Sequence, residues 1–572
     1  MLGQPRFVFQ LLTIVVLTVG ACAPRPDAGP GAAPPSDGQS AARKVLTLGI
    51  QGEPPTIVGT RFGVVSGGTA FGGNNVPPIA HDELMVESHS INNYEPQLAI
   101  EKPSIEKGTW RLSPDGSMEL TWRVHPNVKW HDGTPFTTND LLFTFEVFKD
   151  PDIASTIAQR ALVESATAPD PTMFVVRWSK LYANADQAEG LQPLPRHLVE
   201  DLYRADREAF VRSPVLGTEF VGLGPYKLVT WQPGSHIEFA RHDDYYLGRP
   251  PFDTVIVRFL GDPNTMVANI LAGTVDGLLP RGIDLDQAVE LRQRWEGTGH
   301  QVITGLNGGL RYLEVQHRAE YARPANGITE PLVRQALYHA TDRSSLAEVA
   351  TAGLSPIADS WIAPGEALRP DVDGAIPQYP FYVARGQQLL AQAGWTRGAD
   401  GFLARPNGER FDIAIWARQE QKVEKELNVI ADTWKSLGAR PEIHIIPPAR
   451  ANDREYQSTR PGFFISASSG VNYYENRLHS NQITSAANRW AGFNRGGHNN
   501  PTVDSILDRL AGTIDPRDRI VLHRQLIQEA MGSAAVLPLY WEVAPVVLLK
   551  GVKGHPFVHS HATWKFYLWD KE

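Results

Sequence analysis

Residues 118–148 constrain the fold of this chain more than any other stretch. Apolar and polar side chains alternate over residues 118–124, which is the period of a strand that buries one face. The Asp-Gly pair at 132–133 predicts a tight turn, because glycine adopts positive φ without a steric penalty. Thr138 is expected to cap a helix, since the apolar residues of 141–148 recur at helical spacing. The stretch therefore predicts a strand, a turn and an amphipathic helix in succession.

The length of the chain predicts more than one lobe. With 572 residues it exceeds the size that a single hydrophobic core supports, so two or three lobes are expected. A hydrophobic content of 42% and a charged content of 20% are those of an ordinary soluble globular protein. The net charge is −9 and the chain has no basic run, which argues against a nucleic-acid partner.

Residues 1–22 have the pattern of a secretory signal peptide and are not expected to belong to the fold. Arg6 supplies a positive charge, and the apolar segment 7–19 is too short to cross a bilayer comfortably. Small residues precede Cys22, the only cysteine of the chain. This arrangement resembles a bacterial lipobox, which implies that Cys22 becomes the lipidated first residue of the mature protein. The alternative is a plain secretory signal with an incidental cysteine.

A single cysteine also limits the chemistry of the chain. It excludes an intramolecular disulfide and a zinc site built from several thiolates. Residues 23–43, which are rich in Pro, Ala, Gly and Ser, are predicted to form a flexible tether. A folded body on a tether outside the cytoplasmic membrane follows from these parts.

Motifs spread along the chain resemble one known family. The segment 118–148 carries the clearest of them, and the others are Gly222–Leu228, Leu271–Asp276, Leu310–Val315, Val333–Arg343, Gln387–Trp395 and Leu537–Trp541. On these motifs the chain is similar to the extracellular solute-binding proteins of ABC importers, specifically the peptide/nickel/opine-binding family (family 5). The resemblance covers nearly the whole mature chain.

The resemblance implies an α/β fold of the two-lobed periplasmic-binding-protein type (type II), with an extra inserted subdomain and hinge strands that join the lobes. Lobe I is then expected to comprise residues 45–82, 217–305 and 536–572. The inserted subdomain would be 83–216, and lobe II would be 306–535. A cleft between hinged lobes is where a solute would be enclosed.

Three short patterns have an alternative reading as chemical sites. His131 and Asp132 are a possible metal or catalytic pair, although a histidine beside an Asp-Gly turn is usually structural. The Gly222–Leu228 loop lacks the third glycine and the helix of a phosphate site. Three histidines lie near the C-terminus: His555, His559 and His561. Two of them have the spacing to share a metal on a strand, but the resemblance assigns this end to the scaffold.

The region after residue 460 is expected to meet the ligand. In peptide-binding relatives a strand near 463–470 runs alongside the peptide, which makes Ser466 and Ser468 candidate contacts. A following aspartate binds the α-amino group in those relatives, but here Asn472 or Tyr473 stands near its place. A neutral group cannot pair with an ammonium, and a buried unpaired charge is costly. We therefore expect a solute that lacks a free ammonium.

Further ligand contacts are proposed from residue type and from family position. Arg460 resembles a basic residue near the pocket of some relatives and is suited to a carboxylate; the alternative is a solvated surface arginine. Aromatic candidates for the pocket lining are Trp361, Trp416, Trp490 and Phe493, with core packing as the alternative and as the preferred reading for Trp416. Family position adds Glu53, Asn307, Tyr312, Tyr540 and Trp541.

The sequence predicts a binding protein and not an enzyme, since it has no HExxH, G-x-S-x-G or Walker motif. We expect no cofactor or bound metal. The predicted protein is a lipid-anchored, monomeric receptor of the cell envelope, in a periplasm or on the outer face of the cytoplasmic membrane. It would capture an oligopeptide or similar small polar organic solute by lobe closure and deliver it to an ABC permease and its ATPase. Alternative ligands are a nickel or other metal chelate and an oligosaccharide, and alternative functions are a secreted lipoprotein hydrolase and a periplasmic chaperone or sensory subunit.

Overall fold

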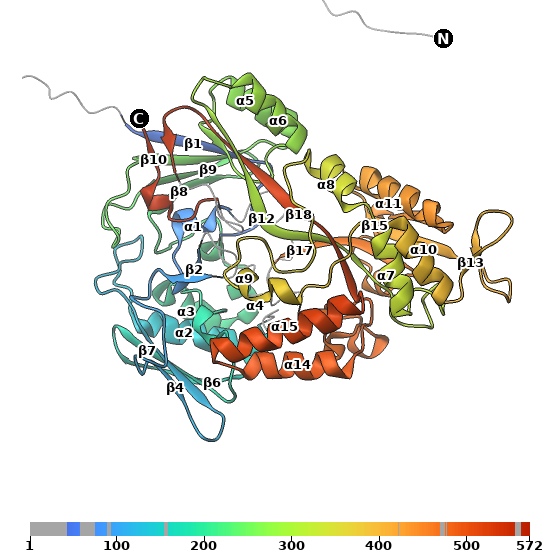
Figure 1. The fold of residues 1–572 in the computed structure, drawn as a ribbon. Coiled ribbons are helices and arrows are strands. Elements are labelled where there is room, and N and C mark those ends of the chain that lie inside the picture. Colours follow the sequence, from blue (N-terminus) through green and yellow to red (C-terminus); the bar gives the residue numbers. More distant parts are fainter. Residues whose placement is uncertain are drawn as a thin grey trace, which may run out of the picture. The chain divides into compact units, whose positions relative to one another are not determined.

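In the computed structural model, the described helices and strands all lie within Arg43–Glu572 (Figure 1). The described residues are 43–57, 75–88, 93–153, 158–420, 422–469, 475, 477–554 and 562–572, without the side chains of 158, 307 and 469. The predictions for Cys22, for the tether up to residue 42, for Tyr473 and for the histidines at 555, 559 and 561 lie outside the described residues.

A ten-stranded mixed sheet runs through this unit in the order β16-β15-β17-β12-β18-β11-β1-β10-β9-β8. β1 pairs in parallel with β10 and β11, and β15 pairs in parallel with β16 and β17. β12 and β18 are antiparallel to their neighbours. The strands are β1 Val45–Ile50, β8 Tyr226–Gln232, β9 His236–Arg241, β10 Thr254–Phe259, β11 Gly277–Leu278, β12 Gln301–Glu314, β15 Asp412–Arg418, β16 Arg440–Ile446, β17 Phe463–Ser469 and β18 Val536–Leu548.

Two long strands carry the sheet from one half of the molecule to the other. β12 and β18 pair first between residues 301–306 and 543–548, and again from residue 310 onward. Between these two paired stretches, residues 307–309 interrupt the register as a bulge. Gly308 has a φ of 70° there, a conformation that glycine adopts at little cost. The bulge bends the strand where it passes between the two halves.

A separate four-stranded sheet, in the order β4-β5-β7-β6, confirms the predicted strand at residues 118–124. Along β5, buried residues alternate with more exposed ones, and the Asp-Gly turn follows with Gly133 at a φ of 91°. The Gly133 N–H donates to the carbonyl of Trp130 at 2.8 Å. The strands are β4 Trp110–Leu112, β5 Met118–Arg123, β6 Val163–Asp170 and β7 Met173–Trp178.

The helix predicted after this turn is α2, Thr138–Lys149, but the residue predicted to cap it was wrong by one position. Thr137 is the N-cap, because its N–H donates to the Asp140 carboxylate at 2.9 Å in a capping box. Thr138 is the first helical residue, and its hydroxyl donates to the carbonyl of Asp170 at 2.5 Å.

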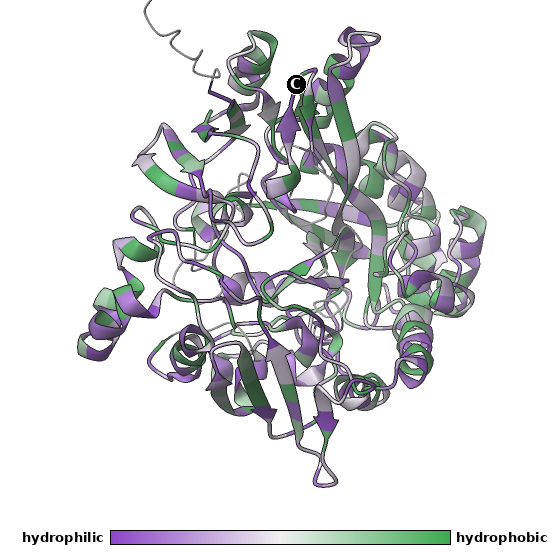
Figure 2. Ribbon diagram, turned by 90° about the vertical axis from the view of Figure 1, so that its left-hand side faces the viewer, coloured by the Kyte–Doolittle hydropathy of each residue, from purple (hydrophilic) through white to green (hydrophobic). Residues whose placement is uncertain are grey.

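The helix predicted from the periodicity of residues 423–437 is confirmed as α11, Val423–Leu437, which ends at Gly438 with a φ of 97°. Along the helices around the main sheet, hydrophobic and hydrophilic residues alternate, as expected where one face is buried (Figure 2). No helix among the described residues is long and apolar enough to cross a bilayer. The other helices are α1 Pro77–Ala80, α3 Arg196–Ala205, α4 Arg207–Val211, α5 Pro263–Leu271, α6 Leu285–Arg294, α7 Pro331–His339, α8 Arg343–Thr351, α9 Arg369–Val372, α10 Val383–Gln392, α12 Arg454–Ser458, α14 Pro501–Gly512 and α15 Pro516–Gly532. Short two- and three-residue strands are β2 Met85–Glu87, β3 Tyr94–Pro96, β13 Thr396–Arg397, β14 Leu403–Ala404, β19 Val552–Lys553 and β20 Asp570–Lys571.

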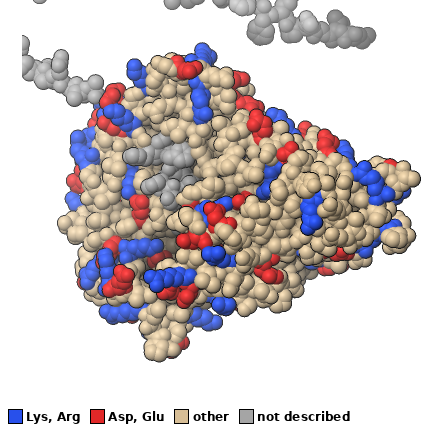
Figure 3. All heavy atoms as spheres, in the orientation of Figure 1, with Lys and Arg blue, Asp and Glu red and all other residues tan. Residues whose placement is uncertain are grey.

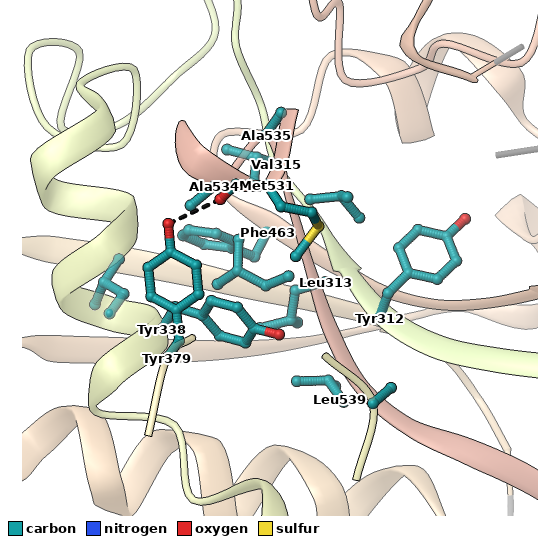
Figure 4. Close-up of a cluster of buried hydrophobic side chains, with 14 of the residues drawn as sticks. Tyr312, Leu313, Val315, Tyr338, Tyr379, Phe463, Met531, Ala534, Ala535 and Leu539 are labelled. Atoms are coloured by element: carbon teal, nitrogen blue, oxygen red, sulfur yellow. Dashed lines mark hydrogen bonds between the residues drawn. The ribbon is translucent and has the colours of Figure 1, made fainter. Parts of the chain in front are cut away.

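The apolar interior is divided into several clusters. The first core joins β12, β15, β17 and the start of β18 to α7, α8, α10, α11, α14 and α15. In this core Tyr338 and Tyr379 lie against each other, and the Tyr379 hydroxyl donates to the carbonyl of Met531 at 2.8 Å (Figure 4). The second core joins β1, β8, β9 and β10 to the end of β18, and the third joins β4, β5 and β7 to α2.

Candidate functional site

The register of the main sheet brings the carboxyl ends of two sets of parallel strands toward each other. β11 pairs with the far end of β18, so β1, β10 and β11 point along β18 toward its first half. β17 is antiparallel to β12, so β15, β16 and β17 point back toward the bulge at 307–309. In open α/β sheets, ligands bind outside the carboxyl ends of strands. The candidate site is therefore the region between these two edges, beside the bulge.

β17 pairs over different lengths with its two neighbouring strands. Its pairing with β15 is limited to Phe463 and Phe464, whereas its pairing with β12 continues to Ser469. Ser466 lies opposite Tyr312, and Ser468 lies opposite Leu310. Ser466 is half-buried, and Ser468 is half-buried as well. Within the described residues, positions 465–467 thus have a strand partner on one side, and the N–H and C=O groups of such an edge are suited to pair with an extended backbone.

A network of buried charges fixes the crossing strands just beyond the bulge. The Arg311 side chain is 1% exposed, and its Nε and Nη2 donate to the Glu426 carboxylate at 2.9 and 2.6 Å. Glu420 lies 3.0 Å from the same guanidinium. Burial opposes the charge, but Glu426 and Glu420 raise the pKa of Arg311 above its ordinary value. Both acids come from α11 or the turn before it, so the network ties that helix to β12.

Two candidate residues of β18 belong to this region and are buried. The hydroxyl of Tyr540 donates to Glu426, and burial together with that carboxylate raises the pKa of Tyr540. Trp541 is 1% exposed, and its carbonyl accepts the hydroxyl of Ser355. Next along the strand, Glu542 lies 3.0 Å from Lys422. The structure thus places Tyr540 and Trp541 in the packing of the crossing strands.

A small cavity joins two further candidates, Tyr312 and Trp361. Its volume of about 30 Å³ is enough for one or two water molecules and not for a whole solute. Trp361 is buried, and its indole N–H has no hydrogen-bond partner among the described residues. The other residues that line the cavity are Glu314, Val315, His317, Arg477, Leu478, Asn494, Gly496, His498, Ala535 and Val536.

Arginines surround the carboxylate of Glu314, which lines this cavity. Glu314 Oε1 lies 3.3 Å from Nη2 of Arg460, and its Oε2 lies 4.0 Å from Nη1 of Arg477. Burial alone would raise the pKa of Glu314, but the guanidinium groups of Arg460, Arg477 and Arg495 lower it below its ordinary value. Arg477 also donates to the Tyr312 hydroxyl. The cavity is therefore lined by an acid that is held ionised by a surplus of positive charge.

Arg460 is not the solvated surface arginine of the alternative reading. Its side chain is 1% exposed, and Nη1 donates to the carbonyl of Gln457 at 2.8 Å. Its partner is the internal carboxylate of Glu314, and it does not line the cavity. A contact between Arg460 and a solute carboxylate stays a prediction.

The remaining candidates are spread over separate places. The carboxylate of Glu53 follows β1 and accepts the indole N–H of Trp231 at 2.6 Å and the N–H of Gly234 at 2.9 Å, which ties this loop to the β8–β9 hairpin. Trp490 is half-buried and Phe493 is 39% exposed, and neither lines the cavity. Asn307 lies in the bulge of β12, and its side chain is outside the described part.

Two of the alternative readings are resolved by contacts. Trp416 packs in a small cluster with Ile446 and Phe464 and lies 4.0 Å from His444 between ring centroids, as expected for core packing. His131 binds the Gly222–Pro225 loop: Nδ1 accepts the N–H of Gly222 and Nε2 donates to the carbonyl of Gly224, both at 3.1 Å. Its role is structural.

Sequence reasoning missed the charged residues of β12. Arg311 and Glu314 are the two charged residues of this central strand, and a charge in such a strand is rarely buried without a specific partner. That signal was available in the sequence. The partners were not, because Glu426 is 115 residues away from Arg311. Among the described residues, no group of three or more His, Cys, Asp or Glu side chains is placed to hold a metal ion.

Comparison with known proteins gives a consistent result. Residues 97–485 match the model of the bacterial extracellular solute-binding proteins, family 5 Middle. The oligopeptide-binding protein AppA of Bacillus subtilis is 26% identical over 468 residues, which cover 77% of this chain and 79% of AppA. NikZ from Campylobacter jejuni in complex with Ni(L-His) superposes with a TM-score of 0.71 at 20% identity, covering 92% of this chain and 99% of NikZ. The oligopeptide-binding protein of Thermus thermophilus complexed with a pentapeptide gives 0.69 at 22% identity, covering 92% and 96%.

Proposed function

We propose that this chain, which belongs to the bacterial extracellular solute-binding proteins of family 5, captures a solute between two hinged lobes. The solute is an oligopeptide or a similar small polar organic molecule. The protein is a non-catalytic solute-binding protein of an ABC importer. Its partners in this proposal are the permease and the ATPase of the importer. Closure is favourable only to the extent that the solute binds the closed state better than the open one.

The observation that carries the proposal is the pair of strands β12 and β18. They connect two halves that have separate apolar cores, and they bend at a bulge between the facing carboxyl ends of parallel strands. We place lobe I at 45–82, 217–305 and 536–572, the inserted subdomain at 83–216, and lobe II at 306–535. The third core around β4, β5 and β7 supports the inserted subdomain, although Phe143, Val147 and Val199 of the same range pack in the second core.

The edge of β17 supports a peptide-like backbone as the solute. Residues 465–467 pair with β12 alone among the described strands, and an extended peptide can add to such an edge through main-chain hydrogen bonds. The position expected for the aspartate that binds an α-amino group holds Asn472 or Tyr473. Glu475 does not replace it, because its carboxylate lies 2.9 Å from His523 Nδ1 and both side chains are buried. We therefore propose a peptide without a free amino terminus.

A solute panel tests this function. The purified protein should show a higher unfolding temperature with N-acetylated pentapeptides than with the same peptides carrying a free amino terminus, because the ammonium has no carboxylate to meet. Opines, nickel–histidine and oligosaccharides complete the panel. A larger shift with nickel–histidine would favour the metal-chelate alternative, which the Ni(L-His) complex of NikZ suggests. No shift with any member would count against solute binding of these kinds.

We also propose that Cys22 carries a lipid that anchors the protein on the outside of the cytoplasmic membrane, whether or not a periplasm encloses it. The support is the lipobox-like sequence before the only cysteine. Cys22→Ser should move the protein from the membrane fraction to the soluble fraction and remove lipid mass from the mature chain. An unchanged distribution between the two fractions would contradict the anchor.

A further inference from the structure

A second contact joins the two halves of the molecule away from the crossing strands. The loop between α14 and α15 meets residues 181–186, which follow β7. The N–H of Ala183 donates to the carbonyl of Ala511 at 2.9 Å. Ile514, at the centre of the loop, packs against the third core together with Leu181. α14 and α15 themselves belong to the first core, so this loop links two cores that are otherwise built from different strands.

Arg519 holds this loop in shape and also reaches across the contact. Its Nη1 donates to the carbonyls of Leu510 and Thr513 at 2.9 and 3.3 Å, which closes the end of α14. Its Nη2 donates to the side-chain oxygen of Asn184 at 3.5 Å. Burial lowers the pKa of Arg519, and the carboxylates of Glu475 and Asp186 oppose that change. The contact therefore combines one apolar side chain with two polar bonds, and it includes a charge that both halves help to compensate.

The contact between residues 181–186 and 511–519 differs from the crossing at the bulge in whether the backbone runs through it. At residues 307–309 the backbone is continuous across the halves, so the contact there persists in any conformation. At 181–186 and 511–519 no strand passes between the halves, and the contact consists of side-chain packing and hydrogen bonds. Figure 1 shows the ends of α14 and α15 next to the sheet of β4, β6 and β7. A rotation about the bulge would separate these surfaces and leave the main sheet paired.

We propose that the contact between residues 181–186 and 511–519 is a latch that holds the lobes closed and so sets the affinity for the solute. The inference rests on the proposed hinged closure. Residues of the latch need not touch the solute. They act on affinity because the apparent dissociation constant equals the intrinsic constant divided by the closed fraction of the protein. Weakening the latch should mainly speed release, since the solute leaves from the open state.

The test compares two substitutions of exposed or half-buried apolar residues. Ile514→Ser removes the apolar contact of the latch. Val521→Ser is the matched control, because Val521 is 51% exposed on α15 and is not part of the contact. Bound N-acetylated pentapeptides should dissociate roughly tenfold faster from Ile514→Ser than from the parent, and at an unchanged rate from Val521→Ser. Asn184→Ala should give a smaller change in the same direction.

Small-angle scattering of the solute-free protein separates failure of the latch from failure of the proposed function. Ile514→Ser should have a larger radius of gyration than the parent and than Val521→Ser, whether or not a solute has been found. Unfolding temperatures check that each variant is folded. Equal release rates and equal radii for Ile514→Ser and the parent would overturn the latch. A peptide panel without binding, combined with a larger radius for Ile514→Ser, would overturn the proposed solute and leave the latch supported.

Discussion

At the scale of single residues, the stability of the crossing region depends on buried charges. Arg311 and Glu426 are almost fully buried and face each other, and Glu420 adds a second acid from the more exposed side. A charge removed from water costs several kcal/mol unless it is paired and hydrogen-bonded. Removing one partner should therefore destabilise the protein far more than removing a charge from the surface.

Substitution of Glu426 tests this dependence. Glu426→Gln should lower the free energy of unfolding by about 3 kcal/mol, because Arg311 then loses the carboxylate to which both its Nε and its Nη2 donate. Glu424→Gln is the matched control on the exposed side of α11, where we expect a change below about 0.5 kcal/mol. Urea unfolding followed by tryptophan fluorescence measures both. Similar losses for the two variants would show that the buried pair contributes little.

Buried histidines and one buried carboxyl make the stability depend on pH in opposite directions. Burial lowers the pKa of His81 to about 3, and burial with the neighbouring His242 lowers the pKa of His131 well below its ordinary value. Unfolded histidines bind a proton below about pH 6.5, so stability falls as the pH drops below that value. Burial raises the pKa of Asp82 to about 7. The folded protein then holds a proton that the unfolded chain releases, and this contribution grows as the pH falls.

The two effects can be separated by substitution between pH 6.5 and pH 5. Asp82→Asn should steepen the loss of unfolding free energy toward low pH by about 1.4 kcal/mol per pH unit, because the opposing proton uptake is gone. His131→Gln should make the loss shallower by a similar amount. The slopes of urea-unfolding free energy against pH measure both changes. Parallel slopes for the parent and the two variants would contradict the assigned directions.

At the scale of secondary-structure elements, the glycines at the ends of α11 and α15 differ in backbone conformation. Gly438 ends α11 in the left-handed region, with a φ of 97°, and its N–H donates to the carbonyl of Lys435 at 2.8 Å. A Cβ at this position would lie 3.0 Å from the carbonyl oxygen of Gly401. Gly532 ends α15 without a positive φ, and a Cβ there meets no heavy atom within 4 Å.

Alanine at these two positions should have opposite effects. Gly438→Ala should cost about 1–2 kcal/mol of unfolding free energy, because a side chain is strained at positive φ and crowded by Gly401. Gly532→Ala should be neutral or stabilise by up to about 1 kcal/mol, since alanine favours the helix. Thermal unfolding of the two variants beside the parent is sufficient. An equal decrease for both would mean that backbone conformation does not decide the difference.

The same elements show what could be predicted from the sequence. β5, α2 and α11 were predictable because their periodic patterns and end signals are local. The cap of α2 was misplaced by one residue, since adjacent threonines at 137 and 138 offer the same side chain and the reciprocal bond to Asp140 decides between them. The candidate site was predicted less completely. The pairing of Ser466 with Tyr312 and of Glu314 with Arg460 depends on contacts between distant segments, which no local pattern encodes.

At the scale of the whole molecule, the distribution of charged side chains does not indicate which kind of partner the protein binds. Acidic and basic side chains are mixed over the face shown in Figure 3. Surface charges of opposite sign also form ion pairs, such as Arg204 with Glu146 and Glu200. The division of the interior gives more guidance, because the first core is joined to the second by the two crossing strands and to the third by the α14–α15 loop contact, whereas the second and third cores share α2. Such a molecule is expected to depart from a single cooperative unfolding transition.

Calorimetry of core variants tests this consequence. Leu526→Ala empties part of the first core and Val257→Ala part of the second, and both side chains are fully buried. Without solute, each variant should lower the unfolding temperature of a different transition. The expected loss of unfolding free energy is about 2–4 kcal/mol for Leu526→Ala and less for Val257→Ala. In the proposed function a saturating solute contacts both lobes, so it should raise the unfolding temperature and merge the transitions into one. If both variants instead lower the temperature of one common transition in the absence of solute, the cores unfold together. The crossing strands would then couple the lobes too tightly for independent movement.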